Sequence, residues 1–136
     1  MPPKKNRLSA ASLSRIALAG FVLILLIATH LPPKSRLLPP EEHGLDKVLH
    51  FSAYATLACL LATAWQLAFG ILTGRHLRWV WCAVVVFGAL DEITQIPVGR
   101  DCSIWDWTAD AVGAAAGLCA FVWLRKRITV RVNEAQ

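Results

Sequence analysis

The chain has 136 residues, of which 56% are hydrophobic, and a formal net charge of +5. A soluble domain of this size would be about 45–50% apolar. The excess lies in long blocks, which excludes an ordinary soluble fold and indicates a membrane protein. The positive charge does not indicate a nucleic-acid partner, because the lysines and arginines cluster at the ends of the apolar blocks, where membrane topology explains them.

The four cysteines indicate neither a disulfide framework nor a metal site. Cys59, Cys82 and Cys119 fall inside apolar blocks, where cysteine behaves as a small hydrophobic residue. Only Cys102 lies in an expected loop, and the sequence gives it no role. No CxxC pair or other metal-ligand spacing occurs, so no metal and no cofactor is expected.

The N-terminal part predicts a basic segment followed by a first membrane span. Residues 1–14 are polar and carry Lys4, Lys5 and Arg7, and the apolar run that follows stops at the proline pair 32–33. A basic head before a short apolar core is also typical of a signal peptide. Residues 28–33 offer no good small-x-small cleavage site, so an uncleaved helix over about 13–31 is favoured. A proline-rich connector is expected to follow it.

A second helix is expected over about 47–69, with Asp46 as its N-cap. Asp46, His50 and Tyr54 are spaced by four residues and therefore lie along one helix face, with Lys47 one turn before the histidine. A single histidine at a helix end is more often a half-buried structural residue than a functional one. Together with a lysine, a tyrosine and nearby carboxylates, His50 becomes a candidate site residue.

A third helix is expected over about 77–96, and Pro97 then ends it. Tryptophans in its first turns are placed as in an interfacial belt. Its last two turns carry Asp91, Glu92 and Gln95. Gly88, Glu92 and Gln95 fall within about 60° of one another on a helical wheel. A glycine on this face is expected to let a neighbouring backbone approach the carboxylate.

A fourth helix is expected over about 104–124, with Ser103 or Asp101 as its cap. One stripe of this helix, about 60° wide, carries residues that step by four, three and four: Asp106, Asp110, Gly113 and Gly117. The GxxxG pattern is typical of close helix packing. Its alignment with the two aspartates indicates which face points into the bundle.

The distribution of basic residues predicts the topology. Ten of the fourteen lysines and arginines lie in residues 1–15, in the turn 70–78 and in the C-terminal tail. The positive-inside rule then places both termini in the cytoplasm, with Glu41 and Asp101 outside. The polar ends of the second, third and fourth helices are therefore expected at the same depth, near the outer boundary of the membrane.

These polar residues also form a recognisable pattern: Asp46-Lys47-x-x-His50-Phe51-x-x-Tyr54, then Asp91-Glu92-x-x-Gln95, then Arg100-x-x-Ser103-x-x-Asp106-x-x-x-Asp110-x-x-Gly113. The pattern resembles that of the VanZ-like family of small bacterial membrane proteins. Asp110 departs from it, because the family more often has asparagine there. The resemblance implies a multi-pass protein of the bacterial inner membrane, associated with the cell envelope. The family takes its name from a glycopeptide-antibiotic resistance gene cluster, and the resemblance supplies no established reaction.

The sequence thus predicts an all-α, four-helix transmembrane bundle with both termini cytoplasmic. Its parts are a basic segment over 1–14, a membrane domain over 15–124 and a basic tail over 125–136. The side chains that could bind a ligand share the outer end of this bundle: Asp46, Lys47, His50, Tyr54, Asp91, Glu92, Gln95, Arg100, Ser103, Asp106 and Asp110. Gly88, Gly113 and Gly117 are expected to serve helix packing. Glu92 is expected to lie near Arg100 or Lys47, because an unpaired carboxylate at that depth is costly.

Four hypotheses for this polar cluster stay open. It could only hold the helices together, or it could bind a glycopeptide or lipid-linked envelope component, which is the favoured function. Crowded carboxylates at low dielectric cannot all ionise, which also suits a membrane enzyme with Glu92, Asp106 or His50 as acid–base groups. The last hypothesis is a small transport or proton-relay protein. Membrane lipids are the expected partners, nucleic acid is not, and the oligomeric state is left open.

Overall fold

The computed structural model describes residues 9–31 and 44–134, and for residues 129–134 it describes the backbone only. Four α-helices make up these ranges: α1 (Ala10–His30), α2 (Leu45–Phe69), α3 (Gly74–Gln95) and α4 (Ile104–Glu134). A short 3-10 turn, η1 (Ile96–Val98), follows α3, and the described ranges contain no strand. Each α-helix contains a stretch long and apolar enough to cross a membrane, and the prediction of an all-α, four-helix bundle is confirmed.

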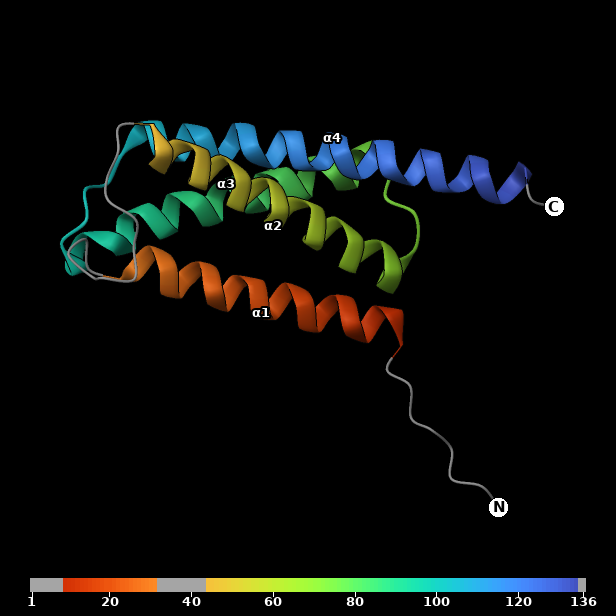
Figure 1. Cartoon of the computed structure of the whole chain (residues 1–136), viewed down its shortest axis with the longest axis horizontal. Coiled ribbons are helices and arrows are strands. Elements are labelled where there is room, and N and C mark those ends of the chain that lie inside the picture. The colour runs from red at the N-terminus through yellow and green to blue at the C-terminus, as the bar shows by residue number, and fades with distance from the viewer. Residues whose placement is uncertain (1–8, 32–43, 135–136) are drawn as a thin grey trace, which may run out of the picture.

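The four helices lie alongside one another as a bundle (Figure 1). The beginning of α1 and the end of α4 lie at one end of it. At the opposite end, α1 and α3 stop while α2 and α4 begin (Figure 1). The polar ends of the helices, which are far apart in the sequence, therefore meet at a single end of the bundle.

The helix ends follow from local chemistry, with one correction to the expected caps. Residue 31 is extended (φ −72°, ψ 135°), as expected immediately before a proline. Gly44, with φ +104°, takes the N-cap position of α2, so the prediction that Asp46 is the cap was wrong. Asp46 instead lies in the first turn, where its negative charge interacts favourably with the helix dipole. The Oγ atom of Ser103 accepts a hydrogen bond from the backbone N–H of Asp106 at 3.4 Å, which confirms Ser103 as the α4 cap.

The expected boundary at residue 124 was also wrong, because α4 continues through the basic segment to Glu134. Lysine and arginine have high helix propensity, and this segment contains neither glycine nor proline. Charge alone therefore marks the end of the apolar span but not the end of the helix. The third helix likewise begins earlier than expected, at Gly74, after a capping box formed by Thr73 and His76.

The closest packing in the bundle is between α2 and α4. A Cβ atom placed on Gly113 would lie 2.3 Å from the carbonyl oxygen of Phe51, and one on Gly117 would lie 2.0 Å from that of Ala55. No side chain can be accommodated at such distances, so the two backbones are in direct contact. The predicted packing role of these two glycines is confirmed.

The outer surface of the bundle is apolar on every helix. Large exposed side chains include Ile24 on α1 (65% exposed), Phe69 on α2 (77%), Trp79 on α3 (62%) and Trp105 on α4 (69%). A surface of this kind suits contact with lipid. Two other tryptophans join helices: the indole N–H of Trp81 donates to a carbonyl of α4, and that of Trp107 donates to one of α3, both at 3.0 Å.

Candidate functional site

Buried polar side chains gather at the end of the bundle where α2 and α4 begin. We call the following residues the polar cluster: Thr29, His50, Asp91, Glu92, Gln95, Asp106 and Asp110. In the described part of the chain, the other buried side chains are apolar apart from the hydroxyl of Tyr54, and their core includes Leu57, Ala62, Val84 and Leu118. The polar groups are thus concentrated in one region, as the sequence predicted.

Asp91 is the centre of a network that joins three helices. Its Oδ1 atom accepts a hydrogen bond from the Thr29 hydroxyl of α1 at 3.0 Å. Its Oδ2 atom accepts from the Tyr54 hydroxyl of α2 and from the amide of Gln95, each at 3.2 Å. Both oxygens of this buried carboxylate are therefore satisfied by protein donors, which indicates a structural role.

His50 and Asp110 form a second contact deep in the bundle. Nδ1 of His50 lies 2.9 Å from Oδ1 of Asp110, and with Asp110 ionised Nδ1 is the donor, because an ionised carboxylate only accepts. Asp110 is fully buried, and its Oδ2 atom has no hydrogen-bond partner in the described part of the chain. A Cβ atom on Gly88 would lie 3.0 Å from this Oδ2, so Gly88 makes room for the Asp110 side chain. The expectation that it would admit a neighbouring backbone was wrong.

Glu92 has partners that differ from those expected. Its Oε2 atom accepts from the backbone N–H of Ser103 at 2.9 Å, and its Oε1 atom is 3.8 Å from Nδ1 of His50. Lys47 instead pairs with Asp106 at 3.2 Å, and Arg100 is 3.9 Å from Asp46. Neither Lys47 nor Arg100 therefore forms an ion pair with Glu92. Desolvating a long cation is costly, so these two cations pair with carboxylates nearer the bundle end, where the Lys47 side chain remains half exposed.

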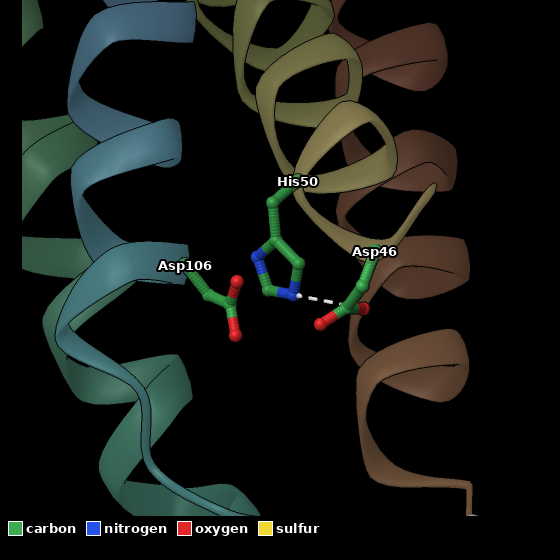
Figure 2. Close-up of side chains that lie close together, drawn as sticks. All are labelled: Asp46, His50 and Asp106. Atoms are coloured by element: carbon green, nitrogen blue, oxygen red, sulfur yellow. Dashed lines mark ion pairs between the residues drawn. The ribbon is translucent and has the colours of Figure 1, made fainter. Parts of the chain in front are cut away.

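The other ring nitrogen of His50 points away from this buried pair. Its Nε2 atom lies 3.8 Å from Oδ1 of Asp46, which is on the same helix face. Figure 2 shows the imidazole between the carboxylates of Asp46 and Asp106, one from α2 and one from α4. His50 therefore contacts the buried Asp110 with Nδ1 and faces the partly exposed Asp46 with Nε2.

A cavity of about 240 Å³ lies between α1 and α2, next to this histidine. Its lining is apolar over most of its length and polar at one end. The described lining residues are Phe21, Ile24, Leu25, Ala28, Thr29, Asp46, Leu49, His50, Ala53, Tyr54 and Arg100. The cavity is thus suited to a molecule that is apolar along one part and charged at one end.

Every residue predicted to bind a ligand takes part in this end of the bundle, but the prediction missed the contribution of α1. Thr29 donates to Asp91, and Nε2 of His30 lies 3.1 Å from the Thr94 hydroxyl oxygen. The signal in the sequence is a polar pair, Thr29 and His30, at the end of an otherwise apolar run. The predicted first span over about 13–31 simply includes this pair. Cys102 is exposed, and the structure gives it no role.

Side chains from α2, α3 and α4 also form two groups of potential metal ligands, which the spacing of residues in the sequence did not reveal. One potential ligand atom each from Asp46, His50 and Asp106 lies within 4.8 Å of the others. The same holds for the more buried group formed by His50, Glu92 and Asp110. Nitrogen and carboxylate donors at such separations are able to hold a divalent cation.

Fold and site together define a four-helix protein whose helices are long and apolar enough to span a membrane, with a buried polar cluster at one end of the bundle. Comparisons of the chain with protein-family models, with curated proteins and with solved structures find no match.

Proposed function

We propose that this chain is a VanZ-like protein of the bacterial inner membrane that binds a lipid-linked envelope component. The cavity between α1 and α2 would hold the ligand, with its phosphate headgroup at the polar end. The observation that carries the proposal is the division of the cavity lining into an apolar length and a charged end. The sequence pattern shared with the VanZ-like family supports the envelope association.

The dimensions and chemistry of the cavity favour a lipid over a free glycopeptide. Its α1 wall extends from Phe21 to Thr29, which is about 12 Å along a helix. Apolar side chains of α2 face this wall, so a hydrocarbon chain would be covered on both sides. At the polar end, the Arg100 guanidinium offers the planar donors that bind phosphate oxygens well. A glycopeptide would leave the apolar length without a function.

The proposal requires the polar end of the bundle to face outward, with both termini in the cytoplasm. The positive-inside rule supports this orientation, because Arg75 and Arg78 lie in the first turns of α3, at the other end of the bundle. Cys102 is exposed in the α3–α4 connection and serves as a natural reporter. In a variant that keeps only this cysteine, a membrane-impermeant maleimide should label intact spheroplasts. A cysteine placed at His76 in a cysteine-free background should be labelled only after lysis, and the reverse pattern would contradict the orientation.

Binding itself can be measured with purified protein in detergent. We expect a polyprenyl phosphate to raise the melting temperature, and the matching polyprenol, which has the same chain without phosphate, to have a much smaller effect. Arg100→Gln should weaken binding of the phosphate form by about 10–100-fold, since a charge-assisted hydrogen bond contributes about 1.5–3 kcal/mol. Arg78→Gln, at the other end of the bundle, is the matched control. Equal binding of both lipids, or no effect of Arg100→Gln, would contradict the proposal.

Glu92→Gln should distinguish a structural role of Glu92 from a functional one. The side-chain carbonyl oxygen of glutamine can still accept from the N–H of Ser103, and the change removes a charge that is expensive to bury. We therefore expect membrane accumulation and melting temperature close to those of the wild type, together with loss of the envelope phenotype that the wild-type gene complements. If accumulation falls in step with the phenotype, Glu92 is a structural residue only.

A membrane enzyme is the second candidate, and the His50–Asp110 contact favours it. A buried carboxylate on Nδ1 fixes the orientation of an imidazole and leaves Nε2 for proton transfer. Turnover of a lipid substrate, lost in His50→Gln, would distinguish catalysis from binding. A proton relay has less support, because the described buried residues toward the other end of the bundle are apolar.

A further inference from the structure

We propose that His50, Asp46 and Asp106 bind a divalent cation of the Mn²⁺ or Zn²⁺ class, through Nε2 of the histidine and one oxygen of each aspartate. The three side chains come from α2 and α4 and converge at the polar end of the bundle (Figure 2). This inference goes beyond lipid binding and does not depend on it.

The orientation of His50 is the first argument. Metal-binding histidines almost always donate their second ring N–H to a carboxylate or carbonyl, which fixes the ring and increases its basicity. The fully buried Asp110 makes this contact at 2.9 Å through Nδ1. A neutral imidazole that donates from Nδ1 carries its free electron pair on Nε2, and this atom lies 3.8 Å from Oδ1 of Asp46.

The geometry of the two acids is the second argument. Their contacts with cations, Lys47 to Asp106 and Arg100 to Asp46, use the Oδ1 atom of each acid and leave Oδ2 for a metal. Potential ligand atoms of the three residues lie within 4.8 Å of one another. In a tetrahedral site with bonds of about 2.0–2.2 Å, ligand atoms are about 3.3 Å apart. Rotation of the three side chains would have to close this difference.

The charge at this end of the bundle is the third argument. Five carboxylates lie here, those of Asp46, Asp91, Glu92, Asp106 and Asp110. In the described chain, the permanent cations that pair with any of them are Lys47, with Asp106, and Arg100, with Asp46. Carboxylates therefore outnumber permanent cations at this end.

Asp110 sharpens this imbalance, because its Oδ2 atom is fully buried and no donor of the described chain reaches it. Such an atom is costly unless a positive charge lies nearby. A divalent cation on Nε2 of His50 would supply that charge. Its effect on the Asp110 carboxylate would be transmitted through the imidazole ring, which contacts Asp110 with Nδ1.

One His nitrogen and two carboxylates select the class of cation. Imidazole suits Zn²⁺ and related transition metals, whereas carboxylates suit Mn²⁺ and Mg²⁺. A mixed set with a single nitrogen is compatible with Mn²⁺ and Zn²⁺ and leaves coordination positions for water or for a ligand oxygen. Lys47 and Arg100 would then lie beside the cation, near the mouth of the cavity.

The test uses the purified full-length chain, stripped with a chelator and titrated with Mn²⁺ alone, with free Mn²⁺ followed by electron paramagnetic resonance. One Mn²⁺ per chain should bind and be displaced by Zn²⁺, and pulsed spectra should show coupling to an imidazole nitrogen. His50→Gln should abolish that coupling, and Asp46→Asn should weaken binding by at least 10-fold. Asp110→Asn, which changes the orienting carboxylate, should weaken it by about 10–100-fold.

Asp101→Asn is the matched control, since Asp101 is an exposed acid of the neighbouring connection, and it should leave binding unchanged. Thermal unfolding without metal establishes that each variant is folded. Asp46→Asn should disturb the fold least, because the Asp46 side chain is 41% exposed. No binding below millimolar Mn²⁺, full binding by the folded Asp46→Asn and His50→Gln proteins, or equal loss in Asp101→Asn would each overturn the proposal.

Discussion

Gly117→Ala is expected to prevent most of the protein from accumulating as a folded bundle. The added methyl group would lie 2.0 Å from the carbonyl oxygen of Ala55. A backbone atom cannot rotate away as a flexible side chain does, so α2 and α4 must separate. Overpacking a well-packed site costs about 1–3 kcal/mol and occasionally more. We expect the upper part of this range, about 3 kcal/mol or more, because the contact is between backbones.

Gly20→Ala is the matched control, because a Cβ atom there has nothing within 4 Å. The measurement is the yield of the monodisperse species in detergent and its melting temperature. The control should match the wild type in both, and Gly117→Ala should lose most of the yield. A Gly117→Ala protein as stable as the Gly20→Ala protein would show that α2 and α4 do not pack as described.

Asp91→Ala should give the second large effect, because it removes the acceptor for donors on three helices. The Thr29 hydroxyl can still donate to the carbonyl oxygen of Leu25 at 3.0 Å. The hydroxyl of Tyr54 and the amide of Gln95 would lose the acceptor that they share. An unsatisfied buried group costs about 1–3 kcal/mol, although hydrogen bonds in membrane bundles are often weaker. We expect a total loss of about 2–5 kcal/mol in the free energy of unfolding.

A double-mutant cycle tests the assignment of this loss. Tyr54→Phe should destabilise the wild type, but it should be neutral or stabilising in the Asp91→Ala background, where it removes a stranded hydroxyl. Asp101→Ala, at an exposed position, is the control for loss of a carboxylate. Equal effects of Tyr54→Phe in the two backgrounds would mean that the Tyr54–Asp91 contact does not carry the energy.

Much of the fold could be predicted from hydropathy and from residues that restrict the backbone. Proline after residue 31 and at residue 97 set the ends of α1 and α3, and the GxxxG stripe of α4 identified the face that packs on α2. The end of α4 could not be predicted in this way, since a run of lysine and arginine ends the apolar stretch but is still compatible with a continuing helix.

The members of the site were predictable, but their partners were not. Spacing by three and four residues placed His50, Glu92 and Asp110 on inward faces, and the structure brings them together. Which carboxylate meets which cation depends on the rotation and depth of each helix in the bundle, and periodicity within one helix does not contain that information. The role of Asp91 depended in addition on α1, whose polar end was interpreted only as part of a span.

The most direct test of a lipid-binding cavity is to identify what the protein carries from its own membrane. The wild-type protein, extracted gently from native membranes, should show a bound phosphate-bearing lipid by mass spectrometry. Ala28→Trp, which fills the cavity from α1, should lose that lipid, and Ile27→Trp, at an exposed neighbouring position, should keep it. Wild-type protein without bound lipid, or equal occupancy in the two tryptophan variants, would contradict the proposed function.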